Sequence, residues 1–157
     1  MTQDGYQTVF EIGLRSFPWA GLLHPAPFIL IGLLLVRFSR GRQLYQIAGA
    51  VGAILATFFF LLLATSFVPD FLKFRHAYKS GESLIVEGVV ENFKPAPTMG
   101  ALKESFSVHG IAFSYYLYSN SPCFHNAPAY RGPVRPGMIV RIFYSDRCIQ
   151  RVDIRKQ

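Results

Sequence analysis

Charged residues are scarce in this sequence of 157 residues, at 16% of the chain, against roughly 25% in an average soluble domain. Hydrophobic residues make up 51%, and a chain with so much apolar surface for its charge is not disordered. The 13 glycines and 10 prolines follow no fixed period, which excludes a collagen-like or other fibrous repeat. The composition leaves a membrane protein, or a soluble protein with one very apolar half.

Signatures of common enzymes are also missing. The sequence has no Gly-rich phosphate loop, no GxSxG elbow, no HExxH and no CxxC. Glu87 and Glu91 share one face of an expected strand, but two acids on such a face are typical of a solvated surface. We therefore expect a protein that is not an enzyme and that has no cofactor and no resident metal.

Two long runs carry no charge, residues 16–36 and residues 44–68. A helix needs about 20 mainly apolar residues to cross the hydrocarbon core of a membrane. The second run contains no proline and is apolar on every face, so it predicts a transmembrane helix over about 44–68. We expect an α+β membrane protein in which residues 1–72 form a membrane anchor.

The first apolar run is interrupted by Pro18, Pro25 and Pro27. Because proline disrupts a helix interior, the run predicts either a kinked span over about 17–38, or a segment 6–20 that lies along the membrane interface. We favour a hairpin of two spans, since the short link between the two runs returns the chain directly.

Small residues stand four apart in the second run, at Ala48, Gly52 and Ala56. Such a stripe lets two membrane helices approach closely. We expect it to pack against the chain's own first helix, with an interface between copies of the chain as the alternative.

Basic residues flank both runs. Arg37, Arg40 and Arg42 lie in the link, and by the positive-inside rule they place the link in the cytoplasm and both termini outside. Lys73, Arg75 and Lys79 oppose that bias from a juxtamembrane linker of residues 73–82. We expect these three to contact anionic lipid head groups, at about 1 kcal/mol each. The prediction is a multi-pass protein of the cell membrane with its C-terminal domain outside the cytoplasm.

From residue 83 the pattern changes to the period of two that is typical of strands. Residues 83–157 predict five strands, in the segments 83–93, 104–118, 138–144 and 148–154, of which 104–118 is a hairpin that turns at His109 and Gly110. A small five-stranded antiparallel barrel of the OB type is the expected package, with an SH3-like barrel as the alternative.

The segments VEGVVENFKPAP, ESFSVHGIAFSY, GPVRPGMIVRIFY and IQRVDI carry a resemblance. They resemble a group of small uncharacterised bacterial membrane proteins that pair two N-terminal spans with one C-terminal β domain. The resemblance covers nearly the whole chain and implies a location in a bacterial inner membrane. It implies no activity and no catalytic residues.

The chain has only two cysteines, Cys123 and Cys148. They could form a disulfide that ties a long loop to the last strand, which would suit a domain outside the cytoplasm. Two free thiols would suit a cytoplasmic domain equally well. A metal site would need further ligands from scattered elements, such as His109.

The C-terminal half carries most of the positive charge, and four of its arginines are candidates for binding an anionic ligand: Arg131, Arg135, Arg141 and Arg151. A three-residue turn at 145–147 would place Tyr144 opposite Cys148. The same register would place Arg141 opposite Arg151, an unfavourable like-charge pair unless an anion or an acidic partner neutralises it. The alternative is a solvated face offset by nearby aspartates.

Two functions are therefore expected. In the first, the β module of a non-enzymatic membrane protein mediates binding to a protein partner or self-assembly into a homo-oligomer. In the second, the protein is a membrane-tethered binder of an anionic ligand, either a lipid head group or a nucleic acid. Aromatic residues beside basic ones suit single-stranded nucleic acid, but only if the domain is cytoplasmic.

Overall fold

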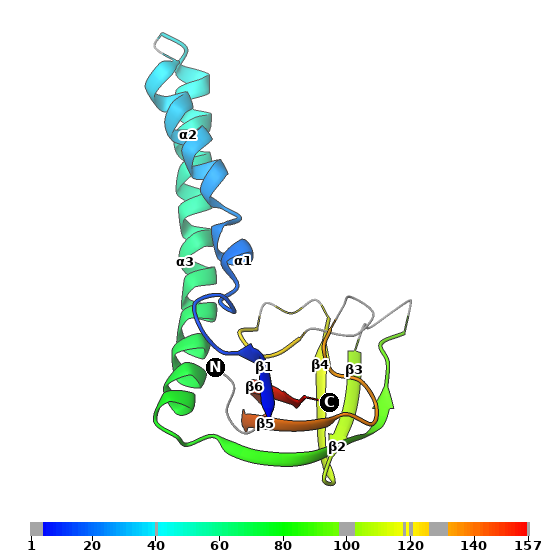
Figure 1. Ribbon diagram of the computed structural model, residues 1–157. Coiled ribbons are helices and arrows are strands. Elements are labelled where there is room, and N and C mark those ends of the chain that lie inside the picture. The colour runs from blue at the N-terminus through cyan, green and yellow to red at the C-terminus, as the bar shows by residue number, and fades with distance from the viewer. Residues whose placement is uncertain are drawn as a thin grey trace. The chain divides into compact units, whose positions relative to one another are not determined.

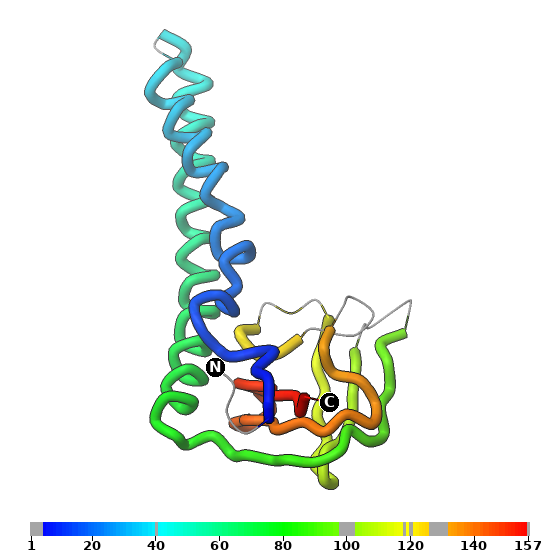
Figure 2. The backbone as a smooth tube through the Cα atoms, viewed as in Figure 1, coloured from blue at the N-terminus to red at the C-terminus, as the bar shows by residue number. Residues whose placement is uncertain are grey.

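The structure is a computed structural model, and it describes residues 5–39, 41–97, 103–117, 119, 121–125 and 132–156. The chain divides into two compact units, a helical unit of residues 18–70 and a β unit that combines residues 1–17 with residues 71–157. The tube in Figure 2 shows the N-terminal segment entering the β unit before the chain turns into the helices. This differs from the expected anchor of residues 1–72, because the N-terminal segment belongs with the sheet.

The helical unit contains α1 (Trp19–Leu23), α2 (Ala26–Phe38) and most of α3 (Gln43–Lys79). The break between α1 and α2 falls at Pro25, which caps α2 and whose ring and missing N–H suit a first helical turn. Residues Trp19–Phe38 together, and α3, are two helical segments long and apolar enough to cross a membrane. Of the two alternatives for the first run, the structure has the kinked helix.

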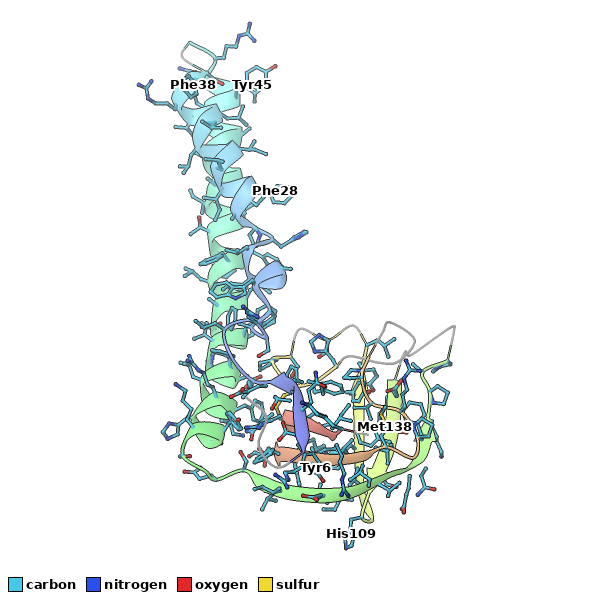
Figure 3. The ribbon with its side chains drawn as sticks, viewed as in Figure 1. Tyr6, Phe28, Phe38, Tyr45, His109 and Met138 are labelled. Carbon is cyan, nitrogen blue, oxygen red and sulfur yellow. A yellow bond between two sulfur atoms is a disulfide. The ribbon has the colours of Figure 1, made fainter. Side chains whose placement is uncertain are left out.

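Large apolar side chains cover the outside of this unit. Phe28, Phe38 and Tyr45 project away from the helix axes (Figure 3). Phe38 is 74% exposed and Ile54 is 66% exposed. An apolar surface of this extent is unusual for a protein surface that faces water.

Helix α3 continues beyond the expected span to Lys79, so the predicted linker of residues 73–82 is helical over most of its length. Pro69 lies inside this helix and has no N–H to donate to the carbonyl of Thr65. The boundary between the two units falls directly after it, between Asp70 and Phe71.

Glycine allows α2 and α3 to approach closely. A Cβ atom on Gly32 would lie 2.6 Å from the carbonyl oxygen of Gly49, and one on Gly49 would lie 2.7 Å from the carbonyl oxygen of Gly32. Ala53 is buried at the same contact, whereas Gly52 faces open space. The contact within the chain therefore uses Gly49 and Ala53 and not Ala48, Gly52 and Ala56. The alternative role of that predicted stripe, between copies of the chain, stays a prediction. Both stripes have small residues four apart, so spacing alone does not choose between them.

The β unit is built on one six-stranded antiparallel sheet in the order β1-β6-β5-β2-β3-β4 (Figure 1). Its strands are β1 (Tyr6–Glu11), β2 (Leu84–Lys94), β3 (Lys103–Val108), β4 (Ile111–Tyr116), β5 (Ile139–Ser145) and β6 (Cys148–Arg155). The sheet has one strand more than predicted, because β1 comes from the N-terminal segment. The expected closed barrel is not confirmed, since among the described residues β1 and β4 are edge strands with one neighbour each.

Strand β2 belongs to both halves of the sheet. Its first part pairs with β5 and its second part pairs with β3, with an irregularity between Glu91 and Lys94. Gly88 lies where β2 passes β3, and a Cβ there would lie 3.3 Å from Cγ1 of Val108. Asn92 has a positive φ of 49°, which fits a bulge. These features bend the strand.

Alternate residues of the strands form one core. Val86, Val140, Ile142 and Val152 point inward from β2, β5 and β6, and each is buried. Aromatic residues of β3 and β4 complete the core, namely Phe106, Phe113 and Tyr115. Two residues that follow β4 in the chain, Phe124 and Val134, belong to the same core.

The hairpin of β5 and β6 differs from the prediction in register. Ser145 pairs with Cys148, so the turn contains only Asp146 and Arg147 and not three residues. Asp146 has a φ of 54°, a conformation that aspartate tolerates better than most residues. Gln150 is then an extra residue in β6, between the pairs Tyr144–Ile149 and Phe143–Arg151.

Each of these two differences shifts the register by one residue. As a result, Arg141 lies opposite Asp153, and the predicted pair of Arg141 with Arg151 is wrong.

Candidate functional site

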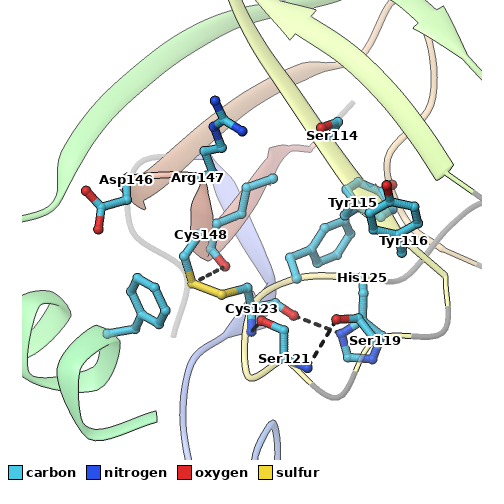
Figure 4. A pocket seen from close by; sticks show the side chains of 13 residues that line it. Ser114, Tyr115, Tyr116, Ser119, Ser121, Cys123, His125, Asp146, Arg147 and Cys148 are labelled. Atoms are coloured by element: carbon cyan, nitrogen blue, oxygen red, sulfur yellow. Dashed lines mark hydrogen bonds between the residues drawn. A yellow bond between two sulfur atoms is a disulfide. The ribbon is translucent and has the colours of Figure 1, made fainter. Parts of the chain in front are cut away.

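A cavity of about 460 Å³ lies beside β4 in the β unit (Figure 4). It is lined by β4, by Ser119 and residues 121–125, and by the β5–β6 turn, with one side chain from the end of α3. Its lining consists of Phe74, Ser114, Tyr115, Tyr116, Ser119, Ser121, Cys123, Phe124, His125, Asp146, Arg147, Cys148 and Ile149.

A disulfide between Cys123 and Cys148 forms one wall of the cavity (Figure 4). It joins residues 25 apart in sequence, and both cysteines of the chain are used. Of the alternatives left open by the sequence, the structure has the disulfide. The bond fixes the segment 121–125 to the first residue of β6.

Phe124 secures the same segment from the core side. Its N–H donates to the carbonyl of Ile149 at 3.0 Å, and its ring stacks edge-on with Phe10 at 5.3 Å and with Tyr115 at 5.2 Å. The wall of the cavity is therefore held by a covalent bond and by a buried aromatic side chain.

Polar groups line the rest of the cavity. Ser119 Oγ accepts from the N–H of Ser121, and Ser121 Oγ accepts from the N–H of Cys123, each at 3.2 Å (Figure 4). Nδ1 of His125 lies 2.8 Å from the carbonyl oxygen of Cys123. Since a carbonyl only accepts, Nδ1 is the donor and Nε2 of the neutral ring is left as an acceptor.

The β5–β6 turn supplies the charges. Asp146 forms an ion pair of 3.0 Å with Lys73, both well exposed. Arg147 lines the cavity without an ion-pair partner among the residues described. Because Lys73 offsets the charge of Asp146, Arg147 leaves the turn with a net positive charge.

A second cavity of about 280 Å³ lies along the same edge. It is lined by Ile111, Ala112 and Phe113 of β4, by Tyr144 of β5, and by Ser114, Asp146 and Arg147, which also line the first cavity. Because the two cavities share these three residues, they adjoin along β4. Together they form what we call the edge groove.

A buried carboxyl group lies behind the groove. Glu104 of β3 is 1% exposed, and the hydroxyl of Tyr115 donates to its Oε1. Its Oε2 has no hydrogen-bond partner in the part of the chain that the structure describes. Burial raises the pKa of Glu104, and burial together with the Glu104 contact raises the pKa of Tyr115.

On the outer face of the sheet, Arg141 is held by Glu87 of β2. Its Nε donates to Glu87 Oε2 at 2.8 Å, and its guanidinium carbon Cζ lies over the ring of Tyr6, 4.4 Å from the centroid. The hydroxyl of Tyr6 donates to Glu87 Oε1 at 2.6 Å. The Tyr6 hydrogen bond, followed by the Arg141 contact, lowers the pKa of Glu87.

Arg151 is held in the same way by Asp153. The two side chains form an ion pair of 2.8 Å, and Asp153 is only 2% exposed. Arg151 also donates to the hydroxyls of Thr8 at 3.0 Å and Tyr78 at 3.3 Å. The Asp153 hydrogen bond is the main cause that raises the pKa of Arg151.

The structure does not gather the four candidate arginines into one free cationic face. Arg141 and Arg151 are paired with carboxylates, Arg135 is exposed, and Arg131 lies outside the described residues. Binding of an anionic ligand by these residues stays a prediction.

The predicted lipid contacts also stay a prediction. Lys73 pairs with Asp146, and the Arg75 guanidinium lies 5.7 Å from the ring centroid of Phe71. Lys79 is the last residue of α3. Among the described residues no group of three or more His, Cys, Asp or Glu side chains could hold a metal ion.

Sequence reasoning missed β1, the burial of Glu104 and the edge groove. The alternation of Tyr6, Thr8 and Phe10 was a usable signal for the strand, since these residues have the period of two. The groove had no such signal, because it depends on which strand ends the sheet.

In comparison with known proteins, the chain matches no protein-family model, no curated protein and no solved structure. Its function is therefore argued from its own geometry.

Proposed function

We propose that this protein is a membrane-anchored interaction module. The helical unit crosses a membrane twice, and the β unit binds another polypeptide, either a partner protein or a second copy. The observation that carries this proposal is the edge of β4, which pairs with no further strand in the described part of the chain, with the edge groove beside it. A sheet edge with unpaired backbone groups is a template for binding another chain.

The membrane part of the proposal has two supports. The exposed phenylalanines and aliphatic side chains of α2 and α3 form an apolar surface that suits lipid. In addition, β1 before the helices pairs with β6 after them. If the helices cross a membrane, the ends of the anchor must then emerge on the same side, which requires an even number of crossings.

The disulfide supports a β unit on the outer side of the cell membrane, because disulfides persist in oxidising compartments. Arg37 and Arg42 lie at the other end of the two helices, in agreement with a cytoplasmic link. For the alternative of an anionic ligand, Arg141 and Arg151 are less suitable, because each would have to leave a carboxylate.

Photo-crosslinking in intact cells tests the proposal. A benzophenone amino acid is introduced at Tyr116, which is half-exposed and lines the groove, and as a control at Ile85, which is similarly exposed on β2 and lines neither cavity. We expect discrete polypeptide adducts from position 116 and none from position 85. The absence of protein adducts at 116, or equal labelling from both positions, would overturn the proposal.

A further inference from the structure

Strand β4 directs half of its backbone groups into the edge groove. Its hairpin with β3 has a two-residue turn, His109 and Gly110, both with positive φ. The pair Val108–Ile111 that flanks such a turn exchanges backbone hydrogen bonds. Along an antiparallel strand the direction of N–H and C=O alternates, so those of 112, 114 and 116 point away from β3.

These outward-facing positions line the groove together with the other residues of β4. Ala112 and Ser114 line the smaller cavity, and Ser114 and Tyr116 line the larger one. No other strand among the described residues pairs with them, since β4 ends the sheet. The groove is therefore bordered by a row of backbone donors and acceptors at the spacing of a strand.

Edge strands are normally protected by charges, prolines, bulges or a covering element. The sequence of β4, IAFSYY, contains no charged residue and no proline, and its pairing with β3 is regular. The opposite edge differs, because β1 has a register shift between Thr8 and Phe10 and ends in Glu11. Of the two edges, β4 is the one that lacks these protections within the described residues.

The charges beside this edge favour an acidic occupant. Arg147 lines both cavities, while Asp146 is neutralised by Lys73. At the other end of β4, Lys103 lies over the Tyr116 ring, 5.8 Å from its centroid. In a symmetric pairing of β4 with β4 of a second copy, both Arg147 side chains would approach the same axis, which is unfavourable. The positive groove instead complements an acidic segment.

We propose that the edge groove binds an extended, acidic segment of a partner protein, which adds to the sheet as a strand beside β4. The backbone of the segment pairs with residues 112, 114 and 116, and an acidic side chain pairs with Arg147. This inference rests on the proposed function and names the chemistry of its partner.

The test uses the full-length protein in detergent, with its disulfide intact, and a displayed library of random octapeptides as the probe. We expect the enriched peptides to be rich in Asp and Glu. Ser114→Pro removes one outward N–H without removing a hydrogen bond to β3, and it should weaken binding of these peptides at least tenfold. Ser114→Ala keeps that N–H and should bind like the wild type.

Charge is tested in the same assay. Arg147→Glu should weaken binding of the acidic peptides about tenfold at low salt, whereas Arg135→Glu should not, since Arg135 is exposed and lines neither cavity. Two versions of each peptide are also offered to the wild-type protein, with N-methyl groups on the odd or on the even amides. Only the version whose methylated amides would face β4 should lose binding. This last measurement holds even where Ser114→Pro disturbs folding.

Enrichment of no peptide, equal binding to folded Ser114→Pro, or indifference to N-methylation would overturn strand addition. Self-association that Ser114→Pro abolishes would instead assign the edge to a second copy. If polypeptide adducts at position 116 persist while the peptide assay fails, the proposed function stands and only this inference fails.

Discussion

The carboxyl group of Glu104 shows how burial changes the behaviour of a single residue. It is buried, with one hydrogen bond from Tyr115 and one oxygen without a partner among the described residues. Burial disfavours the charged form and raises the pKa of this carboxyl. The neutral acid is the form that suits this environment.

Glu104 should therefore make the protein less stable as the pH rises. Below the ordinary carboxyl pKa both the folded and the unfolded state bind the proton, and the full stability is present. Above it the unfolded state releases the proton first, so the free energy of unfolding falls until the raised pKa of the folded state is passed. Denaturant titrations from pH 4 to pH 8 should show this decline in the wild type and not in Glu104→Gln. An equal decline in both proteins would contradict it.

The two ion pairs of the outer sheet face should differ in their contribution to stability. Asp153 is buried, so Asp153→Ala leaves Arg151 without its partner and should cost about 3 kcal/mol. Glu87 is half-exposed, and Glu87→Ala should cost less than about 1 kcal/mol. Denaturant titration of both variants at pH 7 measures the loss in free energy of unfolding. Equal losses would contradict the claim that burial makes the Arg151–Asp153 pair the more stabilising one.

At the scale of elements, the close contact of α2 and α3 depends on Gly49. A Cβ there would lie 2.7 Å from the carbonyl oxygen of Gly32 and 2.7 Å from Cβ of Leu35, whereas one at Gly52 would meet open space. Gly49→Val should therefore destabilise the helix pair by about 1–3 kcal/mol, and Gly52→Val should have little effect. Titration with a denaturing detergent, followed by circular dichroism, compares them. A larger effect at Gly52 would restore the stripe of Ala48, Gly52 and Ala56 as the contact.

Most elements could be predicted from the sequence, because their residues repeat with the period of a strand or run apolar for the length of a span. β2 to β6 were predicted in this way, with the turn at His109 and Gly110. What could not be predicted depends on single residues. The extra residue Gln150 changes the register of the last hairpin, and its amide fits that position by donating to the carbonyl of Phe74 at 2.9 Å. Neither the extra residue nor its hydrogen bond leaves a periodic signal in the sequence.

The candidate site was predicted only in part. Cys123 and Cys148 were identified, but their pairing depends on where the segment 119–125 lies on the sheet. Arg147 was noted as part of a turn, and its place beside β4 follows from the curvature of the sheet, which sequence does not specify. Arg141 was placed in the wrong register, and its partner Glu87 lies 54 residues away.

At the scale of the whole molecule, the disulfide should be needed for the groove. Closing a loop of 25 residues restricts the unfolded chain by roughly 3 kcal/mol in the chain-entropy model. Reduction should lower the free energy of unfolding of the β unit by about that amount, and Cys123→Ser with Cys148→Ser should do the same. The oxidised protein, alkylated under denaturing conditions without reductant, should show no gain in mass. A gain of two alkyl groups would mean that the thiols are free in the cell.

The pairing of β1 with β6 also sets the order in which the molecule can be completed. Tyr6 precedes both helices in the chain, and its partner Arg155 follows them. At roughly 5–20 residues per second, β1 waits on the order of ten seconds for the strand that covers one of its sides. During that time both helices are synthesised, so they can pack against each other before the sheet is complete. β6 therefore acts as a checkpoint, because β1 gains its partner only after β6 has been translated.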